Sequence, residues 1–274
     1  MMKKSSKQVY LHGFTKNEQQ RLRTQASFAE HSVYQNIDFS GCKNILEVGC
    51  GVGAQTEILL RRFPFIDLTS IDLNQEQLKS AKKYLKQIEG FKNRYNLIEM
   101  NAEKMNFEKQ EFDGAFLCWV LEHVPNPSHV LSEVRRVLKP GGKVYVTEVL
   151  NSSFFLDPYS PHVWQYWMAF NDYQYERAGD PFVGAKLGNI LLSLGFKDVR
   201  TEVKTWYLDN RQPQKRKETI DYWSELLMSA SKTLIDEKII TKKLSDQAYE
   251  ELKAVAKNPN AVFFYSFIQA CAVV

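Results

Sequence analysis

The segment Glu47-Val48-Gly49-Cys50-Gly51-Val52-Gly53 decides how this chain folds. It ends an apolar run, Asn44 to Val48, that has the length and composition of a buried strand, and it precedes a helical segment, Ala54 to Arg62. A chain that turns sharply from a strand into a helix needs residues without a Cβ, and such a turn lets a ligand approach the helix N-terminus. A turn required only for packing would give the same pattern, so other segments must decide between the two.

The rest of the chain places this turn at the start of an α/β fold. Amphipathic helices are predicted over Asn74–Glu89 and Pro127–Leu138, and a helical excursion over 217–257 separates the last two strands. Besides Asn44–Val48, strands are predicted at Asp67–Ile71, Asn96–Met100, Phe112–Cys118, Lys143–Val149, Val199–Leu208 and Val262–Val274. We therefore expect a doubly wound, mostly parallel, seven-stranded Rossmann-like sheet with helical lid insertions.

The 274 residues fit one large domain. We expect residues 1–40 to form an N-terminal helical lid segment and residues 41–150 a cofactor-binding α/β core. Residues 151–274 are expected to complete the same domain with aromatic and helical lid insertions and the last two strands.

Composition places the chain among soluble globular proteins, since 44% of its residues are hydrophobic and 25% are charged. The net charge is +4, but the first 24 residues hold six basic residues and one acid, so the body is no polybasic nucleic-acid surface. No secretory signal or membrane span is predicted, which favours a cytoplasmic location. The four cysteines are too widely spaced for a metal or redox motif, and we expect no metal.

Asp72 closes the second predicted strand, about 20 residues after the glycines, where doubly wound folds place an acid that binds ribose hydroxyls. Gly49, Gly51 and Ala54 also satisfy the dinucleotide fingerprint, so these residues alone leave a nicotinamide cofactor open. Glu47 argues against it, because a carboxylate near the turn would repel a pyrophosphate but tolerate an ammonium group. S-adenosylmethionine carries an ammonium and a sulfonium and no phosphate.

Five ordered motifs between residues 44 and 149 resemble the class I S-adenosylmethionine-dependent methyltransferases, particularly the small-molecule type related to quinone biosynthesis. They are the glycine turn, Ile71-Asp72-Leu73, Asn101-Ala102-Glu103, Phe112-Asp113 leading to Leu121-Glu122-His123-Val124, and Leu138-Lys139-Pro140-Gly141-Gly142. The flanking segments Tyr10 to Phe14 and Gly184 to Leu187 resemble an uncharacterised subgroup, which names no acceptor.

The resemblance implies a set of cofactor-binding residues for S-adenosylmethionine, with S-adenosylhomocysteine as its product. The turn lies under the methionine portion, Asp72 binds the ribose, residues 101–103 flank the adenine, and Cys118 and Trp119 line the sulfonium side. The family often has Asp where this chain has Asn101, whose amide oxygen can still accept from the adenine amino group. The full set is Glu47, Gly49, Cys50, Gly51, Gly53, Asp72, Leu73, Asn101, Ala102, Glu103, Cys118 and Trp119.

Methyl transfer from a sulfonium is an in-line displacement, so the protein mainly aligns the acceptor and excludes water. A hydroxyl or protonated amine acceptor also needs a proton acceptor, and Glu148, at the end of the fifth strand, is the first candidate. His123 is the second, although a histidine in such a turn often serves only as a structural hydrogen-bonding group.

The aromatic residues between Tyr159 and Tyr175 suggest that the acceptor is a small, apolar or aromatic molecule. A basic run from Arg211 to Lys217 leaves open an RNA or protein methyltransferase. The sequence also leaves open a non-catalytic protein that binds the cofactor and, against the argument from Glu47, a nicotinamide oxidoreductase. Among partners we expect a small-molecule acceptor and neither a membrane span nor a nucleic acid.

Overall fold

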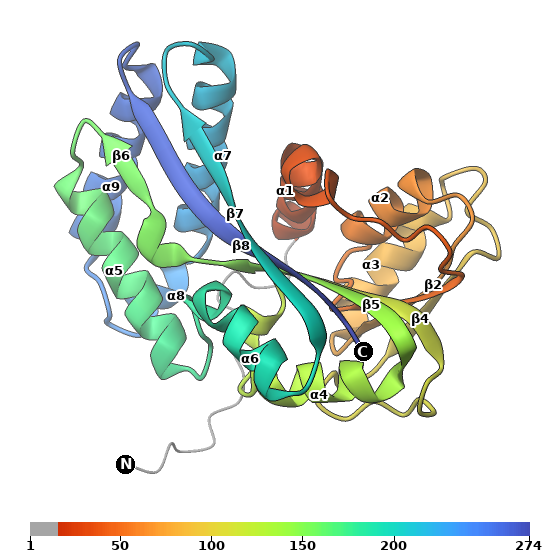
Figure 1. Ribbon diagram of the computed structural model, residues 1–274. Helices are drawn as coiled ribbons and strands as arrows, with labels where there is room; N and C mark the ends of the chain where they lie inside the picture. The colour runs from red at the N-terminus through yellow and green to blue at the C-terminus, as the bar shows by residue number, and fades with distance from the viewer. Residues whose placement is uncertain (1–15) are drawn as a thin grey trace.

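The computed structural model describes residues 16–274, and within that range one sheet of eight strands runs through the molecule (Figure 1). The strand order is β3-β2-β1-β4-β5-β8-β6, and β7 also pairs with β8. Strands β1 to β5 are parallel, whereas β8 is antiparallel to all three of its partners. The strands are β1 (Asn44–Val48), β2 (Asp67–Asp72), β3 (Tyr95–Glu99), β4 (Phe112–Cys118), β5 (Leu138–Val149), β6 (Phe155–Asp157), β7 (Lys197–Leu208) and β8 (Val262–Val273).

The α/β fold with a mostly parallel sheet is confirmed, but the expected count of seven strands is wrong. The additional strand is β6, which pairs with β8 through Phe155 and Phe264. It lies beyond the point where β5 stops pairing, because Val149 faces Phe267 on the same strand. Three residues are too few to leave a period-two pattern in the sequence, so β6 could be found only from its pairing with β8.

The two amphipathic helices predicted from the sequence are present as α3 and α4, and each begins directly after an asparagine that caps it. The Asn74 side chain accepts a hydrogen bond from the Gln77 N–H at 3.0 Å and caps α3. Asn126 caps α4 in the same way, with Pro127 at the first helical position. The helices are α1 (Lys16–Tyr34), α2 (Ala54–Arg62), α3 (Gln75–Leu85), α4 (Pro127–Val137), α5 (Pro161–Glu176), α6 (Leu187–Ser193), α7 (Pro213–Ser229), α8 (Ser231–Asp236) and α9 (Lys242–Lys257), with short 3-10 helices at η1 (Leu121–His123), η2 (Asn151–Ser153) and η3 (Val183–Lys186).

Both faces of the parallel sheet are covered by helices. Ile45 of β1 packs in a core with Leu59 of α2, whereas its neighbour Leu46 packs in a second core with Val130 of α4 and Leu187 of α6. Successive residues of a strand point to opposite faces, so a strand covered on both sides is apolar throughout. With helices packed on both faces of the sheet, the carboxyl ends of the parallel strands β1, β2 and β4 lie along the same side of it.

Strands β7 and β8 are 12 residues each and extend beyond the parallel part of the sheet. Helices α5, α7 and α9 gather around this extension, away from α2 and α3 (Figure 1). The predicted helical excursion between the last two strands is therefore present as α7 to α9. The division into residues 1–40, 41–150 and 151–274 stays a prediction, because the sheet continues from the second range into the third.

The N-terminal segment Tyr10 to Phe14, which resembles an uncharacterised subgroup, lies outside the described residues. Within residues 16–274, no helix has both the length and the apolar character needed to cross a bilayer.

Candidate functional site

The glycine turn between β1 and α2 has a left-handed backbone at all three glycines. Their φ angles are 73° at Gly49, 50° at Gly51 and 76° at Gly53. A Cβ on Gly49 would lie 2.4 Å from a methyl carbon of Val120, whereas a Cβ on Gly51 would meet nothing within 4 Å. Gly49 is therefore required for a close approach of two chain segments, and Gly51 leaves open space beside the backbone.

Asp72 lies at the end of β2, next to this turn. Its carboxylate oxygens accept one hydrogen bond each, from the Gly51 N–H at 2.8 Å and from the Asn74 N–H at 2.8 Å. Burial raises the pKa of Asp72, and the hydrogen bonds from these N–H groups act against that shift. The acid thus fixes the glycine turn and the start of α3 relative to one another.

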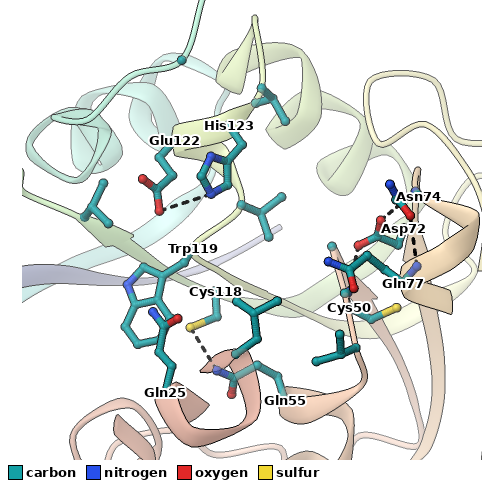
Figure 2. A pocket seen from close by; sticks show the side chains of 18 of the residues that line it. Gln25, Cys50, Gln55, Asp72, Asn74, Gln77, Cys118, Trp119, Glu122 and His123 are labelled. Carbon is teal, nitrogen blue, oxygen red and sulfur yellow. Dashed lines mark hydrogen bonds and ion pairs between the residues drawn. The ribbon is translucent and has the colours of Figure 1, made fainter. Parts of the chain in front are cut away.

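A cavity of about 510 Å³ opens beside the turn, a volume typical of small-molecule sites. It brings together residues from four different strand ends, as the sequence predicts. The predicted site residues in its wall are Gly49, Cys50, Gly51, Asp72, Leu73, Asn101, Ala102, Glu103, Cys118, Trp119 and His123. Figure 2 shows Asp72, Asn74 and Gln77 on one side of the pocket and Trp119, Glu122 and His123 on the other.

Glu47 and Gly53 do not line this cavity. The buried carboxylate of Glu47 accepts hydrogen bonds at 2.6 Å from the hydroxyls of Thr56 and Ser70. Burial raises the pKa of Glu47 to about 7. Glu47 therefore ties β1 to α2 and β2 behind the turn, and it influences a ligand only through the turn that it supports.

Glu148 is also outside the cavity wall, and it is fully buried. One of its oxygens accepts the N–H groups of Val120 at 2.8 Å and Leu121 at 2.6 Å. Burial, together with the neighbouring Glu122 carboxylate, raises the pKa of Glu148 to about 8. Glu148 thus holds the turn after β4, and its carboxylate does not reach the cavity.

These shifts predict that the protein loses stability as the pH rises from 5 to 8. Glu148 keeps its proton up to a pKa of about 8 in the folded chain, whereas the unfolded chain releases it near 4.5. The stabilising contribution of Glu148 is complete below its pKa in the unfolded chain and is lost as the pH rises past its pKa in the folded chain. We expect the free energy of unfolding to fall by about 2 to 4 kcal/mol over this range. Urea unfolding at several pH values should show a shallower slope for Glu148→Gln, and an equal slope would contradict the assignment.

Aromatic rings form the other half of the cavity wall. Trp167 and Phe170 of α5 stack with ring centroids 5.4 Å apart, and the rings of Trp223 and Tyr265 lie 4.6 Å apart. Of the aromatic segment predicted to cover the site, Trp167 and Phe170 line the cavity, whereas Tyr159, Trp164 and Tyr175 are exposed. Sequence reasoning missed four further aromatic residues of the wall: Trp206, Tyr222, Trp223 and Tyr265.

Helix α1 closes the cavity on another side. Arg21 donates to the Tyr222 hydroxyl at 2.9 Å, which connects α1 to α7, and to both oxygens of Glu18 at 2.8 and 2.6 Å. Arg21, Leu22, Gln25 and Ala26 belong to the wall. Helix α1 falls within residues 1–40, whose role as a lid stays a prediction, and no sequence pattern indicated which of its residues face the cavity.

The pocket also contains polar residues that were not predicted, above all Glu122 and Gln174. Glu122 lies within the motif Leu121 to Val124, so the sequence could have indicated that it lies near the cavity. The sequence could not indicate its hydrogen bond with Gln174 of α5. Cys118 accepts a hydrogen bond from the Gln55 amide at 3.7 Å. Among residues 16–274 no group of three or more His, Cys, Asp or Glu side chains is arranged to hold a metal ion.

The chain is similar to known proteins mainly through its parallel-sheet region. Residues 46–146 match a family described as "Methyltransferase domain". The methyltransferase phqN of Penicillium fellutanum is 31% identical over 44% of this chain and 36% of its own. A ubiquinone biosynthesis O-methyltransferase of Dechloromonas aromatica is 39% identical over 41% of this chain and 47% of its own.

The match to solved structures extends further along the chain. The phosphoethanolamine N-methyltransferase 2 of Haemonchus contortus, in complex with S-adenosylhomocysteine, covers 91% of this chain and 52% of its own, with 19% identity and a TM-score of 0.55. The [4+2]-cyclase SpnF covers 91% of this chain and 80% of its own, with 20% identity and a TM-score of 0.52. At these identities the likeness concerns the fold alone.

The curated relatives first matched are similar to this chain over only about a third to a half of their own length. The family predicted from the five motifs is nevertheless confirmed in the region that carries them. Residues 46–146 form a methyltransferase domain of the class I S-adenosylmethionine-dependent type.

Proposed function

We propose that this protein transfers a methyl group from S-adenosylmethionine to a small, largely apolar or aromatic acceptor. One observation carries the proposal: the same cavity has the glycine turn and Asp72 in one part of its wall and a group of aromatic rings in another. A site of this kind can hold a polar cofactor and an apolar acceptor side by side, with water excluded between them.

The residues present suit the cofactor. The open space at Gly51 lets a ligand reach the backbone, and Asp72 offers carboxylate oxygens to the ribose hydroxyls. Asn101, Ala102 and Glu103 are the proposed adenine contacts, and Cys118 and Trp119 the proposed neighbours of the sulfonium. When bound, S-adenosylmethionine supplies a methyl group that is already activated by its positive sulfur.

The chain's own contribution is then to orient the acceptor and to receive a proton where the acceptor has one. His123 lines the cavity with its side chain 28% exposed, and its Nε2 lies 3.6 Å from the Glu122 carboxylate. We keep His123 as the proposed proton acceptor and assign Glu148 to holding the turn that carries it. Trp167, Phe170 and Trp223 provide the apolar surface against which an acceptor packs.

The basic run gives little support to an RNA or protein acceptor. Arg216 is buried and donates to the backbone oxygens of Asn258, Pro259 and Ala261. Lys217 pairs with Asp221 on the helix surface. The run therefore forms no continuous basic face, and a small molecule remains the proposed acceptor.

Calorimetric titration with S-adenosylhomocysteine and, in parallel, with NAD at fixed salt and pH tests the cofactor. We expect saturable binding of S-adenosylhomocysteine alone, since Asp72 and Gly51 suit an adenosine and the acids of the wall disfavour a pyrophosphate. Transfer of labelled methyl groups to a panel of small phenols, amines and apolar ring compounds then tests the acceptor. Binding of NAD alone would overturn the proposal, and turnover only on RNA or protein would overturn its acceptor.

A further inference from the structure

Glu122 is a carboxylate fixed in the wall of the cavity. One of its side-chain oxygens accepts the Gln174 amide at 3.0 Å, and its backbone oxygen accepts the Asp180 N–H at 2.9 Å. Gln174 is itself buried, and its amide also donates to the Glu122 backbone oxygen at 3.3 Å. The carboxylate cannot swing away from the cavity without breaking its bond to α5.

A second acid, Glu148, lies buried behind Glu122 and adds no carboxylate to the cavity wall. The pKa of Glu148 is raised to about 8 by burial and by Glu122. With this raised pKa, Glu148 keeps its proton near neutral pH. Of the two acids, Glu122 is the one whose side chain lines the cavity.

The arginines of the wall do not cancel the charge of Glu122, and His123, 3.6 Å away, would do so only in its protonated form. Arg21 is bound to Glu18, and Arg177 pairs with Glu237 at 2.7 Å. In the part of the wall that the structure describes, the acidic residues are Asp72, Glu103 and Glu122. Both arginines already form ion pairs with acids that do not line the cavity. The cavity wall therefore has an excess of negative charge, which favours a cationic ligand.

The position of Glu122 shows which part of the cavity favours a positive charge. In Figure 2, Glu122 lies on the Trp119 side of the pocket, away from Asp72, Asn74 and Gln77. Cys118 and Trp119 line the same cavity as Glu122. Cys118 and Trp119 are the residues proposed to adjoin the sulfonium.

We propose that Glu122 makes the cavity select a positive charge beside Trp119, so that S-adenosylmethionine binds more tightly than the neutral S-adenosylhomocysteine. This inference rests on the proposed function. S-adenosylhomocysteine, the product, lacks the positive charge that Glu122 attracts. This difference favours the replacement of bound S-adenosylhomocysteine by S-adenosylmethionine. A carboxylate near a cation in a partly dehydrated site changes affinity by about tenfold or more.

The test compares affinities in wild-type protein and in Glu122→Gln, by calorimetry at pH 7 and fixed salt. The ligands are S-adenosylmethionine, S-adenosylhomocysteine and sinefungin, which carries an ammonium-bearing carbon in place of the sulfonium. In wild type we expect both cations to bind about tenfold more tightly than S-adenosylhomocysteine. In Glu122→Gln that ratio should fall to about one, with S-adenosylhomocysteine affinity changed less than about threefold.

Two further variants keep the result interpretable. Glu103→Gln removes another carboxylate from the same wall and should leave the ratio unchanged, even where both affinities fall. Glu122→Asp keeps the charge and should keep the preference, which excludes loss of the local structure as the cause. A ratio unchanged in Glu122→Gln, or lost in Glu122→Asp, overturns this inference alone, whereas failure of all three ligands to bind wild type would overturn the proposed cofactor.

Discussion

Replacing Gly49 by alanine is expected to lower the free energy of unfolding by about 2 to 4 kcal/mol. The φ angle of 73° is unfavourable for any residue with a Cβ, and the new methyl group would lie 2.4 Å from a Val120 methyl carbon. Valine is β-branched and has little freedom to move aside. Because Val120 lies in the turn that Glu148 holds, the displacement should also disturb the cavity.

Gly141→Ala is a matched control for this substitution. Gly141 has a φ of 78°, but a Cβ there meets nothing within 4 Å, so only the backbone cost of about 1 kcal/mol should appear. In the double variant Gly49→Ala/Val120→Ala, the clash with the Val120 methyl group is removed. The part of the lost free energy of unfolding that this clash causes should therefore be recovered, and the part caused by the positive φ angle should remain. Urea unfolding of wild type and these three variants measures both parts, and equal losses for Gly49→Ala and Gly141→Ala would show that the contact with Val120 costs nothing.

Replacing Asp72 by alanine is expected to weaken binding of S-adenosylhomocysteine about 100-fold. The side chain would no longer accept hydrogen bonds from the ribose, and each such bond to a charged group contributes about 1.5 to 3 kcal/mol. The Gly51 and Asn74 N–H groups would also lose their acceptor, so the glycine turn would be less well ordered. Calorimetry with S-adenosylhomocysteine measures the loss directly.

Asp67→Ala provides the comparison for Asp72. Asp67 begins the same strand at its other end, where it forms an exposed ion pair with Lys43 at 2.8 Å and is outside the cavity. Such pairs contribute little, so affinity should remain within about twofold of wild type. Unchanged affinity in Asp72→Ala would mean that the ribose binds elsewhere in the cavity.

The parallel half of the fold was predictable because its signals are local. Strands β1 to β4 are short runs of five to seven residues, and Asn74 and Asn126 mark the starts of α3 and α4 within one turn of sequence. The glycines and Asp72 were predictable for the same reason, since the turn and the strand end that follows lie within 26 residues.

The acceptor side of the cavity was not predictable in the same way, because its residues come together only through tertiary packing. Trp206 and Tyr265 lie on β7 and β8, and Tyr222 on α7, far along the chain from Trp167. Their patterns are those of ordinary buried positions in strands and helices. Glu148 shows the converse difficulty, since its position at a strand end suggested a proton acceptor, but its side chain accepts backbone N–H groups and does not line the cavity.

The place of β8 has a consequence for how the protein is made. β5 ends at Val149, yet its partner on that side begins only at Val262. While the chain emerges from the ribosome, the open edge of β5 must therefore remain unpaired until β8 has been synthesised. An apolar strand in that state is exposed to pairing with other chains, so slow translation of residues 150–261 would prolong the interval in which a chaperone is needed.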